Sequence, residues 1–253
     1  MTDRMPYILG NWKMNLDIET AMSVAADVAD IANDAAADVG VGLAIPYPWI
    51  PLIASEHAES NLLIGAQDVS PEESGAFTGD VSAGMLAPWC TFVIIGHSER
   101  RSIHGESNAL VRAKLAAALA HGMAPVLCVG ETQAQRDAGL TMDVVSDQVR
   151  SASTHLGGVE LRSLLVAYEP VWAIGTGLTA EPTDAQAVAA HIRQVLGTVD
   201  IEAAASVPIL YGGSVNGDNA DAYFACPDVD GALVGGASLS ADAFLPIVRA
   251  ALG

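Results

Sequence analysis

The chain has 253 residues, 51% of them hydrophobic, and this length suits a single domain of about 250 residues. Its formal net charge of −19 argues against nucleic acid or an anionic membrane as a partner, because such partners bind basic surfaces. A halophilic source or a solubility bias would each explain the excess acid, and the low charged fraction of 16% favours the second.

Eight short apolar segments alternate with helical patterns along the chain. The predicted strands cover residues 7–10, 39–45, 62–66, 92–95, 124–129, 164–168, 207–211 and 231–234. The first predicted helix follows Asp17, an N-cap candidate, and later helices cover residues 49–59, 108–121, 142–156, 183–196 and 241–252. Strands that alternate with helices form βα units rather than hairpins.

This alternation predicts an α/β fold: a single closed (β/α)₈ barrel over residues 1–253, with eight parallel strands inside and helices outside. The runner-up architecture, an open doubly wound sheet, requires a glycine-rich dinucleotide turn after an early strand, and residues 10–13 do not form one. The long connection at residues 67–80 carries Phe77 within a Gly-Ala-Phe-Thr-Gly run. Loops of this length are usually functional or interface loops.

No apolar run reaches the roughly 20 residues of a membrane-spanning helix, and the first residues lack the apolar core of a signal peptide. The three cysteines, Cys90, Cys128 and Cys226, are far apart and include no Cys-x-x-Cys pair. We therefore expect a cytoplasmic protein with reduced, mostly buried thiols, and neither a disulfide framework nor a zinc site.

Residues able to do chemistry lie almost entirely after predicted strands. They are Asn11 and Lys13 after the first strand, His97, Ser98 and Glu99 after the fourth, Glu169 after the sixth, residues 212–214 after the seventh, and Gly235 and Gly236 after the eighth. In a barrel these positions share the C-terminal face, where active sites form. The topology therefore predicts one common site.

Glu169 ends the sixth strand and is followed by Pro170, by the apolar residues 171–174 and by two glycines, Gly175 and Gly177. This pattern is typical of an apolar lid with flexible hinges. A carboxylate beneath such a lid loses water when the lid closes, which makes it a stronger base. An ordinary surface glutamate before an ordinary loop is the alternative, and this stretch taken alone does not decide between them.

Each remaining candidate also has an ordinary interpretation. His97 could be a core histidine, but its place after a wholly apolar strand favours catalysis. Lys13 could be a solvated surface charge, yet in a chain with only two lysines its place at a strand end favours an anionic ligand. One glycine pair could be a simple turn, whereas pairs after two consecutive strands favour main-chain binding of phosphate. The histidines and carboxylates show no metal-ligand spacing, so no metal is expected.

Residues 168–177, Tyr-Glu-Pro-Val-Trp-Ala-Ile-Gly-Thr-Gly, resemble the catalytic-base and lid motif of the triosephosphate isomerase family. Further matching motifs, in family order, occupy residues 10–15, 75–79, 95–101, 128–131, 211–214 and 234–238. The resemblance covers nearly the whole chain and is of the bacterial type. It implies a TIM barrel that interconverts dihydroxyacetone phosphate and D-glyceraldehyde 3-phosphate through an enediolate, in glycolysis and gluconeogenesis, without a cofactor.

The same resemblance implies roles for individual residues. Glu169 would be the base, His97 the neutral electrophile, Lys13 the offset for phosphate and enediolate charge, and Asn11 a guide for the substrate oxygens. Gly175, Ser214, Gly235 and Gly236 would bind the phosphate. Ser98 would hold Glu169 while the lid is open, Glu99 would pair with Lys13, and Ile174 and Leu233 would clamp over Glu169, with Tyr211 among the supporting residues.

Residues 75–79 resemble the family's dimer loop, which includes Phe77 and Thr78. The resemblance implies an obligate homodimer in which Thr78 reaches Asn11 and Lys13 of a second copy. Two other functions remain to be weighed. One is a different sugar-phosphate isomerase or an aldolase on the same barrel; an aldolase would need a Schiff-base lysine inside the barrel, and Lys13 and Lys114 are both poorly placed for that. A non-catalytic phosphate-binding barrel would lack the base, the electrophile or the lid, whereas all three are present.

Overall fold

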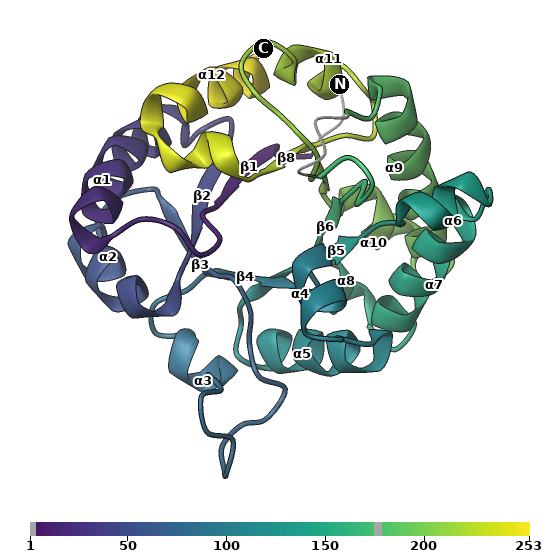
Figure 1. Cartoon of the computed structure of the whole chain (residues 1–253), viewed down its shortest axis with the longest axis horizontal. Coiled ribbons are helices and arrows are strands. Elements are labelled where there is room, and N and C mark those ends of the chain that lie inside the picture. Colours follow the sequence, from purple (N-terminus) through teal and green to yellow (C-terminus); the bar gives the residue numbers. More distant parts are fainter. Residues whose placement is uncertain (1–3, 175–178) are drawn as a thin grey trace.

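The computed structural model describes residues 4–174 and 179–253, and its centre is a closed barrel of parallel strands in sequence order (Figure 1). The strands are β1 (Tyr7–Asn11), β2 (Gly40–Ile45), β3 (Leu63–Ala66), β4 (Phe92–Ile95), β5 (Ala124–Val129), β6 (Leu165–Tyr168), β7 (Ile209–Tyr211) and β8 (Gly231–Val234). Because β8 pairs with β1, the sheet has no free edge. The predicted (β/α)₈ barrel is confirmed, and the open sheet is excluded.

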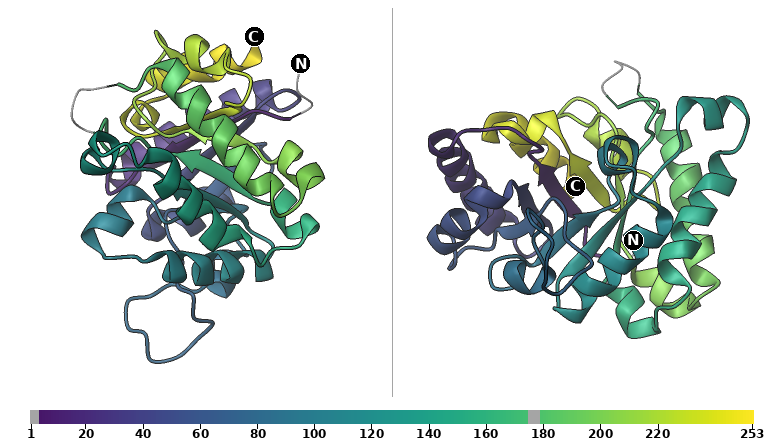
Figure 2. Two further views of the ribbon diagram at one scale, coloured as in Figure 1. Left: turned by 90° about the vertical axis from the view of Figure 1, so that its right-hand side faces the viewer. Right: turned by 60° about the horizontal axis from the view of Figure 1, so that its bottom comes forward.

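Helices surround the barrel as an outer ring (Figures 1 and 2). They are α1 (Ile18–Ala35), η1 (Tyr47–Trp49), α2 (Ile50–Glu56), α3 (Ala83–Leu86), α4 (Ser98–Ile103), α5 (Asn108–Ala120), α6 (Gln133–Asp137), α7 (Thr141–Ser153), α8 (Gly158–Arg162), α9 (Pro182–Gly197), α10 (Ile201–Ser206), α11 (Ala220–Phe224), η2 (Gly236–Leu239) and α12 (Ala241–Leu252). The predicted cap of the first helix is confirmed, because the Asp17 carboxylate accepts a hydrogen bond from the N–H of Thr20.

The sequence pattern missed the shortest helices, among them α4 and α6. A helix of five or six residues shows barely one and a half turns, too few to reveal a 3.6-residue period. The predicted seventh strand was also too long at its start. Val207 instead caps the end of α10, and its carbonyl accepts a hydrogen bond from Arg193, so the strand begins at Ile209.

The hydrophobic core has two layers, separated by the barrel wall. Alternate strand residues face opposite ways: Ile8 packs toward the helices and Leu9 fills the barrel. This double burial explains the continuous apolar strands seen in the sequence. Gly65 leaves room inside the barrel for Phe92, whose ring would lie 2.3 Å from any Cβ added at that glycine.

The connection between β3 and β4 projects from the body of the protein, and two views agree on this (Figures 1 and 2). Its base is closed by a hydrogen bond from the N–H of Ser70 to the carbonyl of Val81, at 2.8 Å. Lys114 of α5 supports the same region, because its buried ammonium pairs with Asp68 at 2.6 Å and with Glu106. The sequence pattern placed Lys114 on a helix but did not predict this ionic cluster.

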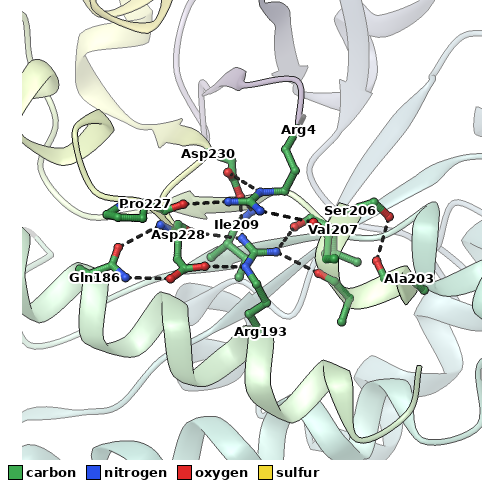
Figure 3. Close-up of polar contacts among 12 residues, drawn as sticks. Arg4, Gln186, Arg193, Ala203, Ser206, Val207, Ile209, Pro227, Asp228 and Asp230 are labelled. Carbon is green, nitrogen blue, oxygen red and sulfur yellow. Dashed lines mark hydrogen bonds and ion pairs between the residues drawn. The ribbon is translucent and has the colours of Figure 1, made fainter. Parts of the chain in front are cut away.

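Four charged residues form an ionic network at the N-terminal end of the barrel (Figure 3). Asp230, just before β8, pairs with Arg4 at 2.7 Å and with Arg193 of α9 at 2.9 Å, and it accepts the N–H of Ile209 at 2.9 Å. Arg193 also pairs with Asp228 at 2.7 Å. This network therefore links the segment before β1, the helix α9, β7 and β8, and it lies beside the β7–β8 seam.

Cys90 and Cys128 are buried and Cys226 is half-buried, and all three are free thiols. Burial raises the pKa of Cys90 to about 12, which leaves that thiol protonated and unreactive near neutral pH. In the part of the chain that the structure describes, every helix is too short or too polar to cross a membrane.

Candidate active site

A cavity of about 680 Å³ opens at the C-terminal ends of the strands. The predicted site residues that line it are Asn11, Lys13, His97, Ser98, Glu99, Glu169, Ile174, Ser214, Leu233, Gly235 and Gly236. Residues from β1, β4, β6, β7 and β8, far apart in sequence, thus share one mouth, as the topology predicts. Gly175 lies outside the described residues, and Tyr211, Phe77 and Thr78 lie away from this cavity.

Glu169 and His97 form a buried pair at the centre of the cavity wall. Glu169 is 2% exposed and His97 is 5% exposed. Glu169 Oε1 lies 2.8 Å from His97 Nε2, and Oε2 accepts the main-chain N–H of Ser98 at 2.8 Å. Ser98 therefore holds the carboxylate through its backbone amide. The pair sets a proton acceptor directly against a proton donor.

The other ring nitrogen of His97 reveals the tautomer that the site favours. The main-chain N–H of Glu99 donates to Nδ1 at 3.2 Å, so Nδ1 must carry a lone pair and Nε2 the proton. Burial disfavours the protonated ring, but contact with the Glu169 carboxylate outweighs it and raises the pKa of His97. A ligand seated between the two side chains would remove that contact, and burial together with the N-terminus of α4 would then favour the neutral ring.

Lys13 reaches the cavity from a strained turn after β1. Its φ of 53° lies in the left-handed region, which costs a non-glycine residue roughly 1–3 kcal/mol. Asn11 Oδ1 accepts the Lys13 N–H at 3.0 Å, and Gln67 Nε2 donates to the Lys13 carbonyl at 2.9 Å. The ammonium pairs with Glu99 at 2.6 Å, as the resemblance implies. Sequence reasoning missed Gln67, although it directly follows β3 and so occupies a strand end.

Two glycines that follow strands allow close approaches to Lys13 and to Glu169. A Cβ at Gly235 would lie 3.8 Å from Lys13 Cε, so the turn after β8 adjoins the lysine. A Cβ at Gly130 would lie 1.7 Å from the Glu169 carbonyl, so only glycine fits there. The sequence pattern also missed Gly130, because nothing in its own motif shows that the backbone of Glu169 packs against it.

Tyr211 and the other histidines lie outside the cavity lining and make contacts within the fold. Tyr211 stacks on Tyr223 with ring centroids 4.1 Å apart, and burial raises its pKa. Its hydroxyl is buried without a hydrogen-bond partner among the described residues. Residues 4–174 and 179–253 contain no group of three side chains suited to hold a metal ion. The other histidines lie away from the cavity, where His121 pairs with Glu73 and His191 contacts Ser146.

A barrel whose rim sets a buried carboxylate against an imidazole, with a lysine alongside, defines an enzyme of the acid–base type. The model of the triosephosphate isomerase family matches residues 6–251. The triosephosphate isomerase of Halorhodospira halophila is 49% identical over 250 residues, which covers 98% of each chain. That of Chloroflexus aurantiacus is 48% identical over 97% of this chain and 99% of its own. This chain belongs to the triosephosphate isomerase family.

Proposed function

We propose that this chain interconverts dihydroxyacetone phosphate and D-glyceraldehyde 3-phosphate, with Glu169 and His97 as the proton-transfer pair. The observation that carries the assignment of roles is the 2.8 Å contact between Glu169 Oε1 and His97 Nε2 at the wall of the cavity. Isomerisation moves a proton between two adjacent carbons, and it needs one base beside both carbons and one donor aimed at the carbonyl oxygen.

The substrate would enter between the two side chains. Glu169 takes a proton from C1 of dihydroxyacetone phosphate while the Nε2–H of His97 donates to the C2 carbonyl oxygen. The negative charge that develops on the enediolate is offset by His97 and by Lys13. The carboxylic acid of Glu169 then returns its proton to C2, and a proton moves from the C1 hydroxyl to the C2 oxygen through the imidazole. The electrons stay within the substrate throughout.

The phosphate group would lie against Ser214, Gly235 and Gly236, because small residues let main-chain N–H groups approach an anion. Gly175 would add a further amide from the segment outside the described residues. Lys13 borders the turn at Gly235 and supplies the positive charge for this end of the substrate. Asn11, on the same wall, would orient the substrate oxygens.

Water must be excluded, because an exposed enediolate eliminates phosphate. Ile174 and Leu233 line the cavity with Glu169 and would provide apolar cover for the base. Tyr211, the last residue of β7, pairs with Tyr168 directly before Glu169 and would support the base from there. Removing water also strengthens the electrostatic contacts of Lys13 and His97 with the substrate.

A coupled assay with glyceraldehyde 3-phosphate tests these roles in Glu169→Gln. General-base catalysis typically contributes about 10²–10⁴-fold, so kcat should fall by that factor while the melting temperature stays near that of the wild type. Glu202→Gln on α10 is the matched control, since that exposed carboxylate lies on the outer ring. Equal activity in the two variants would refute Glu169 as the base.

The functional unit that we propose is a homodimer in a reducing, cytoplasmic compartment. Phe77 is 45% exposed at the tip of the projecting loop, and Met14 is 95% exposed beside the active site. A second cavity, of about 270 Å³, lies next to Met14 and is lined by Lys13, Tyr47 and Gln67 among others. These features support insertion of the loop of one copy, with Phe77 and Thr78, into this cavity of another.

Analytical ultracentrifugation with activity assays tests the dimer. In Thr78→Arg, the new cation would face Lys13 of the second copy, so we expect monomers with at least tenfold lower kcat. Val159→Arg is the matched control, because Val159 is 80% exposed on α8, away from the loop. A wild-type chain that is monomeric and fully active would exclude the dimer as the functional unit.

A further inference from the structure

Glu131 is a fully buried carboxylate that lies outside the active-site cavity. It accepts hydrogen bonds from Trp172 Nε1 at 2.9 Å and from the Tyr168 hydroxyl at 3.2 Å. Tyr168 immediately precedes Glu169 in the chain, and Trp172 follows it by three residues. Burial and the adjacent Glu131 raise the pKa of Tyr168, which keeps its hydroxyl a donor. One carboxylate therefore holds both sides of the base.

A buried carboxylate needs a positive partner, because the loss of water is otherwise uncompensated. Among the described residues, Arg136 of α6 is the cation that pairs with Glu131, with 3.5 Å between Nη1 and Oε1. The same guanidinium covers the ring of Trp172 at 4.3 Å from the ring centroid. Its other end pairs with Asp184, in the first turn of α9, at 2.8 Å.

Arg136 thus contacts the chain on both sides of residues 173–183: Trp172 before them and Asp184 after them. The helix that carries Arg136 is fixed at its start by a capping box, in which the side chains of Thr132 and Gln135 each accept the other's backbone N–H. The planar guanidinium can stack on an indole and pair with a carboxylate at once, which a lysine cannot do. Nothing in the sequence motif around Glu169 points to this arginine.

We propose that Arg136 is a positioning residue for the isomerisation: it holds the indole of Trp172 and the carboxylate of Glu131, and through them it places the Glu169 segment. This role rests on the isomerase activity proposed above. Arg136 does not touch the substrate cavity, so it acts on where the base lies and not on phosphate binding. Loss of the arginine should therefore lower kcat and leave KM nearly unchanged.

Steady-state kinetics of Arg136→Met test the proposal, with Arg150→Met as the matched control. Arg150 is an exposed arginine of α7 that makes no ion pair within the described part of the chain, so both variants remove one positive charge. Small displacements of catalytic groups can cost up to about 10²-fold in rate, and we expect kcat to fall about tenfold or more. KM should stay within about twofold, as should both constants of the control.

Three further measurements separate positioning from general destabilisation. Arg136→Lys keeps the charge but loses the stacking, so its drop in log kcat should be at least half of the drop seen for Arg136→Met. The same variant replaces Arg136→Met if that variant does not fold. In a Trp172→Leu background, Arg136→Met should cost less than in the wild type, because the route through the indole is gone and only the route through Glu131 and Tyr168 is left. Hydrogen–deuterium exchange should rise over residues 168–174 in Arg136→Met and not in Arg150→Met, and this readout does not depend on turnover.

The proposal is overturned if Arg136→Met and Arg150→Met share the same kcat, if the effect appears in KM alone, or if the cost is unchanged in the Trp172→Leu background. Unchanged exchange over residues 168–174 in Arg136→Met would also overturn it. A wild-type chain without isomerase activity would instead refute the proposed function, and exchange over residues 168–174 would still decide the placement role of Arg136.

Discussion

At the N-terminal end of the barrel, Arg193 directs its donors at Asp228, Asp230 and three backbone carbonyls. At the C-terminal end, Lys13 has one ionic partner among the described residues, sits on a strained backbone and faces a cavity. Both ends gather charges at strand termini. At the first end the charges are enclosed by their partners, whereas at the second the paired charges face a cavity that a ligand can enter.

The contrast suggests a division of labour between the two ends. A saturated network resists change, because every donor has an acceptor and removing one leaves others unpaired in a buried place. At the C-terminal end, polar groups that face the cavity can form new contacts with a substrate. Changes at the N-terminal end should therefore lower the free energy of unfolding with little loss of rate. Changes at the C-terminal end should lower the rate with little loss of stability.

The largest expected effect is on rate, in His97→Gln. The glutamine amide can donate to the carbonyl oxygen, but it cannot carry a proton between the two substrate oxygens. General acid–base catalysis contributes about 10²–10⁴-fold, so we expect kcat to fall within that range while the free energy of unfolding changes by less than about 1 kcal/mol. Coupled kinetics and urea unfolding on the same samples measure both. A large loss of stability here would break the contrast.

Arg193→Met should show the reverse pattern. It removes the donors to the half-buried Asp228, to the buried Asp230 and to two backbone carbonyls. Removing one partner of a fully buried ion pair costs about 3–5 kcal/mol of unfolding free energy, and less is lost here because Asp228 is partly exposed and Asp230 keeps Arg4. We expect a loss of about 2–3 kcal/mol in urea unfolding, with kcat within about twofold at a temperature where the variant is folded. A tenfold loss of kcat in the folded variant would contradict the separation of the two ends.

Gln67→Leu sharpens the comparison, because it alters a supporting hydrogen bond at the functional end. The change removes the donors to the carbonyls of Lys13 and Ala44 and lets the strained turn relax. We expect kcat/KM to fall about tenfold, since the strain to be held is roughly 1–3 kcal/mol. Glu56→Gln, on an exposed part of α2, is the control. Kinetics equal to that control would show that Gln67 does not hold Lys13.

The smallest expected effect concerns pH and the N-terminal network. Burial alone would raise the pKa of Asp228, but hydrogen bonds from Arg193 and Gln186 hold it below its ordinary value of 3.8. A carboxyl with a lowered pKa adds stability above that ordinary value, and the contribution is lost as pH falls through the folded-state pKa. Unfolding between pH 6 and the acid range, compared with Asp228→Asn, should therefore show a steeper acid loss for the wild type. Parallel curves would remove Asp228 from the acid response.

Much of this site could be predicted from local signals. Glu169, His97 and Lys13 follow apolar strands, and the strand order alone brings them to one face. Gln67 obeys the same rule and could have been found by it. Gly130, Glu131 and Arg136 could not, because their roles are defined by what packs against them: the carbonyl of Glu169, the hydroxyl of Tyr168 and the indole of Trp172.

The amino-acid sequence by itself determined the barrel, since eight strands buried on both faces and separated by helices have few other ways to satisfy every backbone group. It also determined which side chains meet at the mouth. Only the tertiary structure decided how those side chains are held, as in the tautomer of His97, and how Arg4, Arg193 and Asp230 meet at the opposite end of the barrel. Such contacts join residues far apart in the chain, where distance and direction come from packing and leave no periodic trace in the sequence.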